Sequence, residues 1–220
     1  MYKTEELFDL EHTICKKYLQ ECEYPWEALP LIKKFIKELI EDLDKSEYKE
    51  AGKDVWVHNS VKIAPTASLN GPCIIGKDTE IRPGAYVRGN VIVGEGCVIG
   101  NSCELKNAIV FDKSQIPHFN YVGDAILGFH AHMGAGSIVS NLKADGRDII
   151  IKDGKKKVET HLRKFGAMIG DNAEIGCNSV MNPGTIIGRN SNIYPLARVR
   201  GIVPANSIFK DEDNVVEKKK

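Results

Sequence analysis

Several side chains that could carry acid–base chemistry fall within one short stretch of the sequence, residues 116–124. It holds His118, Asn120, Tyr121 and Asp124. An imidazole titrates near neutral pH, so His118 is a candidate general base for deprotonating an attacking amine or hydroxyl. A lone histidine is more often structural than catalytic. The polar side chains that follow it, which could orient the base or recognise a substrate, favour the catalytic interpretation.

Two other groups of residues invite a binding role. His130 and His132 would face the same side of a strand, as two ligands of one metal ion would. No carboxylate or third histidine stands at a matching spacing nearby, so no metal site is expected. The lysines at residues 155–157 and the pair Arg163-Lys164 are either a solvated loop tip or part of a phosphate or cofactor site.

The elements that must position these side chains follow from a repeat of six residues. An apolar residue recurs at every sixth position at Val57, Ile63, Leu69, Ile75, Ile81, Val87, Val93, Ile99 and Leu105. The repeat continues in two shifted phases, residues 110–122 and 127–199, and we expect the shifts to be short loops. A small residue, such as Cys73, Cys97 or Cys103, falls four places after many of the apolar ones.

This period excludes an α-helix, whose apolar face recurs about every 3.6 residues. One large and one small inward position in every six residues is typical of a parallel β-helix with three short strands per coil. Residues 55–207 are therefore predicted to form a hexapeptide-repeat solenoid. The three cysteines at the small position are predicted to be inert core thiols.

The predicted coil of eighteen residues relates two cations to each other. Arg88 and Lys106 are one such coil apart, so their side chains should stack on the same face. Two adjacent cations form an anion site, and a phosphate there would gain charge-assisted hydrogen bonds from the guanidinium and the ammonium. The alternative is two unrelated surface cations.

The rest of the chain divides around this solenoid. Residues 1–50 are predicted to be a helical segment, with one amphipathic helix through Leu7 and Tyr18 and a second over residues 31–43. Open ends of a solenoid need caps, and we expect this segment to provide one, with Trp26 anchoring it to the first coil rather than serving as a ligand platform. The solenoid is expected over residues 51–210. A loop insertion at about residues 140–166 should contain a β-hairpin at residues 148–160, and residues 211–220 should form a charged tail.

The composition limits the class of protein. Lys plus Arg and Asp plus Glu both number 30, so no overall field attracts nucleic acid or an anionic membrane. No apolar run is long enough to span a bilayer, and the first six residues are too acidic for a signal peptide. The six cysteines are scattered and form no CxxC pair, so we expect reduced thiols in a soluble, cytoplasmic protein.

Together these motifs resemble a known family, the hexapeptide acyltransferases, and within it the acetyltransferase domain of bacterial and archaeal bifunctional sugar-1-phosphate nucleotidyltransferase/acetyltransferases. The resemblance covers about residues 55–210 and rests on four segments: His118-Phe-Asn-Tyr121-Val-Gly123-Asp124, Gly134-Ala-Gly-Ser, Ser140-Asn141-Leu142 and Gly166-Ala-Met-Ile-Gly-Asp171-Asn172. It implies a mainly β fold, a left-handed parallel β-helix. It further implies a homotrimer with active sites between subunits, where acetyl-CoA lies along the groove of one solenoid.

The resemblance also implies roles for single residues. His118 matches the general base, and the sugar phosphate would be held by Arg88 and Lys106. The sugar contacts are matched by Tyr121, Asn141 and His132, and the coenzyme A contacts by Ala135, Cys177 and Lys164. Arg82 is a competing match for the phosphate cation, but it misses the one-coil spacing. His132 stands where the bacterial members carry an asparagine, and Leu142 replaces a tyrosine, so the identity of the sugar stays open.

Three functions are compatible with these residues. The first is an acetyl-CoA-dependent N-acetyltransferase acting on a phosphorylated amino sugar, with His118 as the base and a backbone N–H near residues 134–136 as the oxyanion donor. The second is a non-catalytic sugar-phosphate-binding or regulatory solenoid that partners a separate nucleotidyltransferase, since these residues contain no glycine-rich nucleotide-binding start and no βαβ pattern. The third is a zinc solenoid like a carbonic anhydrase, a class that has a His-x4-His pair where this chain has His130-x-His132.

Overall fold

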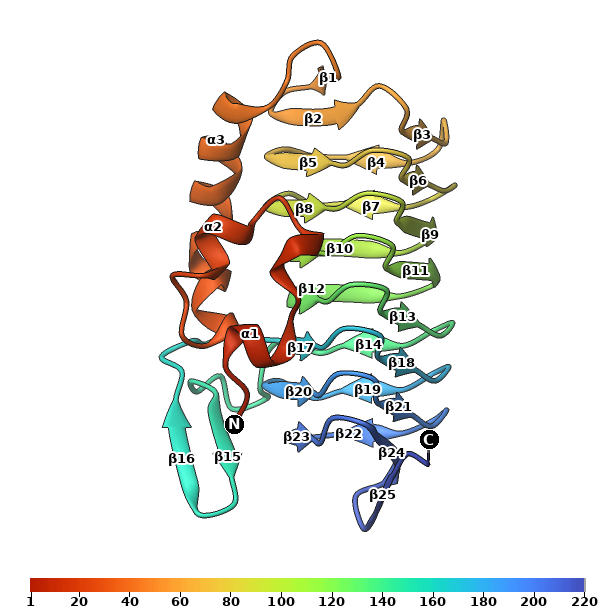
Figure 1. Ribbon diagram of the computed structural model, residues 1–220. Helices are drawn as coiled ribbons and strands as arrows, with labels where there is room; N and C mark the ends of the chain where they lie inside the picture. Colours follow the sequence, from red (N-terminus) through yellow and green to blue (C-terminus); the bar gives the residue numbers. More distant parts are fainter. Residues whose placement is uncertain (220) are drawn as a thin grey trace.

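The computed structural model describes residues 1–219, and its dominant element is a parallel β-solenoid (Figure 1). Short strands stack in three columns, which we call the first, second and third faces. Along each coil the chain passes from the first face to the third, then to the second, and back to the first. The predicted solenoid is confirmed.

Each face is a stack of strands from successive coils. The first face consists of β2 (Val55–His58), β5 (Cys73–Ile75), β8 (Val91–Val93), β10 (Glu104–Val110), β12 (Tyr121–Leu127), β17 (Ala167–Ile169), β20 (Thr185–Ile187) and β23 (Ile202–Val203). The second face consists of β4 (Ser68–Leu69), β7 (Tyr86–Val87), the first residues of β10 and β12, β14 (Ile138–Val139), β19 (Val180–Met181) and β22 (Arg198–Val199). The third face consists of β3 (Lys62–Ile63), β6 (Glu80–Ile81), β9 (Val98–Asn101), β11 (Gln115–His118), β13 (His132–Met133), β18 (Glu174–Ile175), β21 (Asn192–Ile193) and β24 (Ser207–Asp211).

The inward side chains of the three faces form one core along the solenoid axis. The large repeat positions, such as Val87, Ile99 and Leu105, are fully buried, and each contributes roughly 1.5–3 kcal/mol by leaving water. Cys73 and Cys97 lie at the small inward positions as free thiols, and burial raises the pKa of each to about 12. The predicted role of these cysteines as core residues is confirmed.

The phase shifts of the repeat are not loops, and that prediction was wrong. Paired strands are eighteen residues apart in the upper coils, whereas Val91 pairs with Ala108, and Ala108 pairs with Ala125, seventeen residues on. β10 and β12 run unbroken through the shift, each seven residues long. The chain turns the corner at Asn107 (φ 50°) and Asp124 (φ 48°). Asn and Asp visit this left-handed conformation more easily than other residues because their short polar side chains hydrogen-bond locally.

The N-terminal residues form several short helices instead of two. Lys16–Leu19 (α2) is separated from Thr4–Leu7 (α1) by the 3₁₀ turn η1 (Leu10–His12), and the 3₁₀ helix η2 (Pro25–Leu31) leads into α3 (Ile32–Asp42). The first predicted helix is broken because Asp9 and Thr13 accept hydrogen bonds from nearby backbone N–H groups, which competes with helical pairing. The second predicted helix is confirmed as α3.

The helices of this N-terminal segment cover the side of the solenoid and do not cap its end (Figure 1). The segment packs on the outward side chains of the first face, which are buried: Ile74, Ile92, Ile109, Ile126, Met168 and Ile186. Trp26 stacks on Phe165, with 5.8 Å between ring centroids, at the coil that follows the insertion rather than at the first coil. The two ends carry antiparallel hairpins instead, β1 (Tyr48–Gly52) with β2, and β24 with β25 (Asn214–Glu217).

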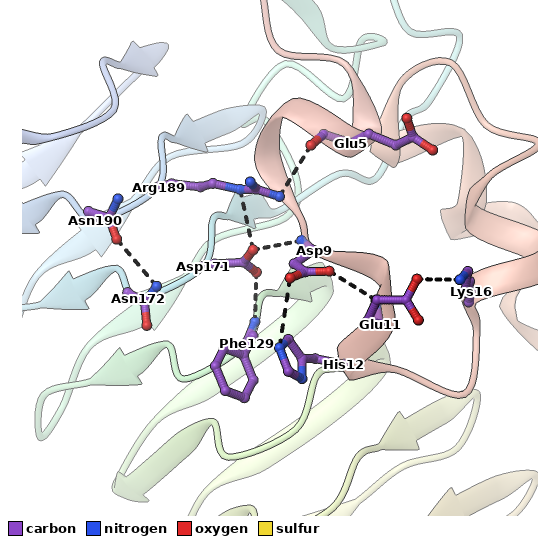
Figure 2. A network of polar contacts seen from close by, with 10 residues as sticks. All are labelled: Glu5, Asp9, Glu11, His12, Lys16, Phe129, Asp171, Asn172, Arg189 and Asn190. Carbon is purple, nitrogen blue, oxygen red and sulfur yellow. Dashed lines mark hydrogen bonds and ion pairs between the residues drawn. The ribbon is translucent and has the colours of Figure 1, made fainter.

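A buried carboxylate fastens this segment to the solenoid (Figure 2). Asp171 accepts hydrogen bonds from the backbone N–H groups of Asp9 (2.6 Å) and Phe129 (2.8 Å). Its third partner is the Arg189 guanidinium, at 3.3 Å. The ring of His12 stacks on Phe129 at 3.7 Å, so the first residues of the chain are held by both polar and aromatic contacts.

The insertion leaves the solenoid at the corner between the second and first faces. It contains the predicted hairpin, formed by β15 (Ile150–Asp153) and β16 (Lys156–Glu159). Ile149 and Ile151 are buried in the same apolar cluster as the N-terminal segment. The expected tail differs, since residues 214–217 form β25, and Lys220 lies outside the described residues. No helix in residues 1–219 is long and apolar enough to cross a membrane.

Candidate active site

The outward residues of the second face stand one above another in successive coils. Glu104 pairs in register with Tyr86 above it and with Tyr121 below it, and Tyr121 pairs with Ile138. Tyr86 is exposed, and Glu104 and Tyr121 are half-buried. This column gives the second face a strip of aromatic and acidic groups between two corners.

A buried carboxylate organises the corner between the second and first faces. Asp124, with 4% of its surface exposed, accepts hydrogen bonds from Lys106 Nζ (3.0 Å), Asn107 Nδ2 (2.9 Å) and Asn141 Nδ2. Arg88 lies one coil above Lys106, as predicted, since the preceding residues Val87 and Leu105 pair in register. We call Lys106, Asn107, Asp124 and Asn141 the Asp124 cluster.

The two cations do not form the bare anion site that the sequence predicted. Lys106 forms an ion pair with Asp124, and Arg88 donates a hydrogen bond to Glu104 at 2.7 Å. Breaking a buried pair by removing one partner costs roughly 3–5 kcal/mol, whereas exposed pairs contribute little. The side chains of Arg88 and Glu104 are 44% and 33% exposed, so Arg88 is the cation that can exchange its partner for an anion.

The phenol of Tyr121 is held over the backbone of Gly123. A Cβ atom on Gly123 would come within 2.5 Å of Tyr121 Oη, so only glycine leaves room for the ring. Asn141 Nδ2 donates to Oη at 3.3 Å. Burial, with the charges of Asp124 and Glu104, raises the pKa of Tyr121. The phenol therefore stays protonated and can donate a hydrogen bond to a substrate.

His118 lies at the opposite edge of the second face, at the corner where the third face ends. Its side chain is exposed, and the next residue, Phe119, has a left-handed backbone (φ 52°) and is 62% exposed. The backbone here is fixed, because the His118 carbonyl accepts from Gly136 N (3.0 Å) and its N–H donates to Asn120 Oδ1 (3.1 Å). Asn120 itself is buried and donates to the carbonyl of Gly134, so it supports the turn instead of facing a ligand.

The predicted coenzyme residues Ala135 and Cys177 continue the His118 corner downwards. Asn178 N donates to the Ala135 carbonyl at 2.8 Å, which places Cys177 in the next coil below. Cys177 is exposed. The N–H groups of Gly134 and Gly136 are already bonded, to the carbonyls of Ile175 and His118. Within residues 1–219, the Ala135 N–H is the one of the three candidate oxyanion donors that has no hydrogen-bond acceptor.

Two predicted site residues lie away from the residues with which they were grouped. Lys164 pairs with Leu142 at the base of the insertion, on the Asp124 side of the second face and not on the Ala135 side. His132 lies on the third face, with Nδ1 2.9 Å from Glu174 Oε2. Arg82 pairs with Glu80 on the same face at 3.2 Å. Their predicted binding roles remain predictions.

Two further features concern ligands. Within residues 1–219, no three His, Cys, Asp or Glu side chains are grouped closely enough to hold a metal ion. A cavity of about 900 Å³ lies between the insertion and the last coils, lined by residues that include Lys152, Asn182, Arg200 and Phe209. It does not contain His118, and nothing in the sequence repeat predicted it.

Comparison with known families bears out the repeat. The family model described as bacterial transferase hexapeptide (six repeats) matches residues 166–201, and the model described as the GMPPB C-terminal domain matches residues 69–156. The chain is a hexapeptide-repeat protein. Both matches fall on the solenoid, and the second extends into the insertion.

Two curated relatives of this hexapeptide-repeat protein are named as bifunctional proteins. The bifunctional protein GlmU of Methanococcus maripaludis strain S2 is 32% identical over 224 residues, which cover 93% of this chain and 50% of that protein. The bifunctional sugar-1-phosphate nucleotidylyltransferase/acetyltransferase of Sulfurisphaera tokodaii is 32% identical over 71% of this chain and 43% of that protein. The chain thus spans about half the length of the curated relatives it matches. The resemblance that the motifs indicated is confirmed.

The solved structures that match the chain are more distant in sequence. The acetyltransferase domain of PglB from Neisseria gonorrhoeae, in complex with acetyl coenzyme A, is 14% identical with a TM-score of 0.39 and covers 74% of this chain and 57% of that chain. The perosamine N-acetyltransferase of Caulobacter crescentus is 13% identical with a TM-score of 0.31 and covers 76% and 57%. At this level of similarity neither structure bears on the function of the present chain.

Proposed function

We propose that this hexapeptide-repeat protein is an acetyl-CoA-dependent N-acetyltransferase that acts on a phosphorylated amino sugar. The observation that carries the proposal is the arrangement on the second face, where Arg88, Tyr121 and Asn141 come from three different coils and His118 stands at the far edge of the same face. The curated relatives support the reaction class, because one of them is named a bifunctional sugar-1-phosphate nucleotidylyltransferase/acetyltransferase.

In the proposed reaction, His118 removes a proton from the amine of the sugar as that nitrogen attacks the thioester carbonyl. A C–N bond forms, the C–S bond breaks, and coenzyme A leaves as a thiol after taking up a proton. The Ala135 N–H stabilises the oxyanion of the tetrahedral intermediate. The Arg88 guanidinium leaves Glu104 to bind the sugar phosphate, and the Tyr121 phenol donates to a sugar oxygen.

We further propose that the protein acts as a homotrimer with the site between subunits. This assembly follows the family resemblance and would bring residues of a second copy to the second face. It offers Lys164 and His132 a place in the site, since within one chain Lys164 lies away from Ala135 and His132 lies on the third face. Sedimentation of the full chain would give the number of copies.

The test is release of free thiol from acetyl-CoA in the presence of hexosamine 1-phosphates. His118→Asn should lower the rate by roughly 10²–10⁴-fold, the usual contribution of a general base. His130→Asn is the matched control, because His130 is an exposed histidine at a different corner with no assigned role. Equal rates for wild type and His118→Asn would remove His118 as the base. Absence of thiol release with every hexosamine phosphate would refute the substrate class.

A further inference from the structure

The N-terminal segment reaches the Asp124 cluster directly. The carbonyl of Leu29, in η2, accepts a hydrogen bond of 3.1 Å from Asn107 Nδ2. Three residues earlier in the same 3₁₀ helix, Trp26 stacks on Phe165. The segment that covers the first face therefore touches, at two points, residues next to the proposed acceptor site.

Asn107 connects the two parts with a single amide group. Its Nδ2 carries two hydrogens, and the two acceptors are Leu29 O and Asp124 Oδ1, at 3.1 Å and 2.9 Å. Both hydrogens are thus used, and the orientation of the amide is fixed. Asp124 is almost fully buried, so its carboxylate depends on such donors for stabilisation. The same carboxylate orients Lys106 and Asn141.

A second connection runs through the aromatic pair. Phe165 N donates to the Asn141 carbonyl at 3.0 Å, and Gly166 N donates to the Asp124 carbonyl at 2.7 Å. The ring of Trp26 therefore packs on a residue whose backbone is bonded to Asn141. Through Leu29 and through Trp26, η2 constrains both the side chain and the backbone of the Asp124 cluster.

From these contacts we infer that Asn107 is a positioning residue through which η2 holds the Asp124 cluster in the geometry that binds the acceptor sugar. This inference rests on the proposed function for its substrate. It assigns the N-terminal segment a part in acceptor binding in addition to covering apolar surface. The chemistry at His118 lies at the opposite edge of the second face and does not depend on this connection.

Asn107→Asp is the most direct variant. Aspartate has the same size and tolerates the left-handed corner, but it cannot donate to Leu29 or to Asp124. The matched control is Asn90→Asp. Asn90 occupies the same corner one coil above, with φ 52°, and its side chain makes no hydrogen bond to any part of residues 1–219. Asn107→Gly removes the side chain without adding a charge and keeps the backbone free to adopt positive φ.

The kinetic outcome separates positioning from general loss of structure. Asn107→Asp and Asn107→Gly should raise KM for the hexosamine phosphate about tenfold or more, the effect of losing a hydrogen bond to a charged group. The kcat and the KM for acetyl-CoA should stay within about twofold of wild type, and Asn90→Asp should change none of these constants. The inference is wrong if the Asn107 variants lower stability but leave the KM for the hexosamine phosphate unchanged. It is also wrong if Asn90→Asp raises this KM as much as Asn107→Asp does.

A measurement without substrate keeps this inference separate from the proposed function. Hydrogen–deuterium exchange of residues 24–31 and 164–166 should speed up together in Asn107→Asp and stay at wild-type rates in Asn90→Asp. A wild-type protein without transferase activity would refute the proposed function, while coupled exchange would still support the connection between η2 and the cluster. Unchanged exchange of residues 164–166 in Asn107→Asp would overturn the connection even in an active enzyme.

Discussion

Replacing Gly123 with alanine should displace the phenol of Tyr121. A Cβ atom at position 123 would lie 2.5 Å from Oη, 2.7 Å from Cζ and 2.8 Å from Cε1 of that side chain. Carbon atoms in contact prefer a separation of about 3.5–4.0 Å, so the ring must move by roughly 1 Å. We expect the free energy of unfolding to fall by about 1–3 kcal/mol, the usual cost of an overpacked site.

A double-mutant cycle identifies the ring as the cause. Tyr121→Phe keeps the two ring carbons that clash, so Gly123→Ala should cost about the same in that background. Tyr121→Ala removes the ring, and there Gly123→Ala should cost almost nothing. Urea unfolding of the single and double variants measures the coupling, which we expect to be about 1–3 kcal/mol.

Gly52→Ala is the matched control for this cycle. The nearest atom to a new Cβ at position 52 is Val55 Cγ2 at 3.8 Å, an ordinary contact. This variant should therefore leave stability nearly unchanged. An equal loss for Gly123→Ala in the wild-type and Tyr121→Ala backgrounds would refute the packing argument, because the cost would then come from the backbone and not from the ring.

Three further predictions follow from burial and charge. Cys177 is the one exposed cysteine of the six, so iodoacetamide should label it alone in the folded protein, and acetyl-CoA should slow the labelling, as mass spectrometry can show. Lys106→Ala should lower the free energy of unfolding by about 3 kcal/mol, because the buried carboxylate of Asp124 loses its cationic partner. Arg88→Ala should leave the melting temperature unchanged and weaken only acceptor binding. Burial raises the pKa of Asp171 above its ordinary value, so the folded protein binds this proton more tightly than the unfolded chain does. The stability that Asp171 contributes should therefore fall as the pH rises from about 4 through the raised pKa, and Asp171→Asn should lack this part of the pH dependence in unfolding titrations.

The solenoid could be predicted from the sequence because its signal is local and repeated. Each inward position, such as Val87 or Leu105, must hold an apolar side chain that fits the solenoid core. The six-residue period would remain visible even if one coil lacked such a residue. The covered first face was missed, although the sequence carries its signal. Ile74, Ile92 and Ile109 lie between two inward residues of their strands, where an uncovered face would carry polar side chains. Three consecutive apolar residues in a strand indicate burial on both sides.

The candidate site was predicted less completely, because its charges are partnered across coils. The coil length correctly placed Arg88 above Lys106, but spacing alone could not show that Glu104 and Asp124 neutralise them. Asp124 was expected to orient the base or to recognise a substrate, and it instead lies beneath the surface as a hydrogen-bond acceptor. Nothing local in the sequence indicates which of two neighbouring polar residues turns inward.

The shortened coils explain why the buried polar cluster forms where it does. At the eighteen-residue coil above, the corner uses two residues with positive φ, Gly89 (φ 98°) and Asn90 (φ 52°). Loss of one residue per coil leaves a single left-handed residue at each of the next two corners, Asn107 and Asp124, and the strands continue through them. Because the strand continues through the corner, the corner residue stays in register with the coils above and below. Its side chain therefore contacts the residues that strand pairing places next to it. The short amide and carboxylate that permit this conformation are also the groups that bond to each other, to Lys106 and to Leu29. One change in coil length therefore produces both the tight corner and the polar contacts that fix the acceptor side of the proposed site.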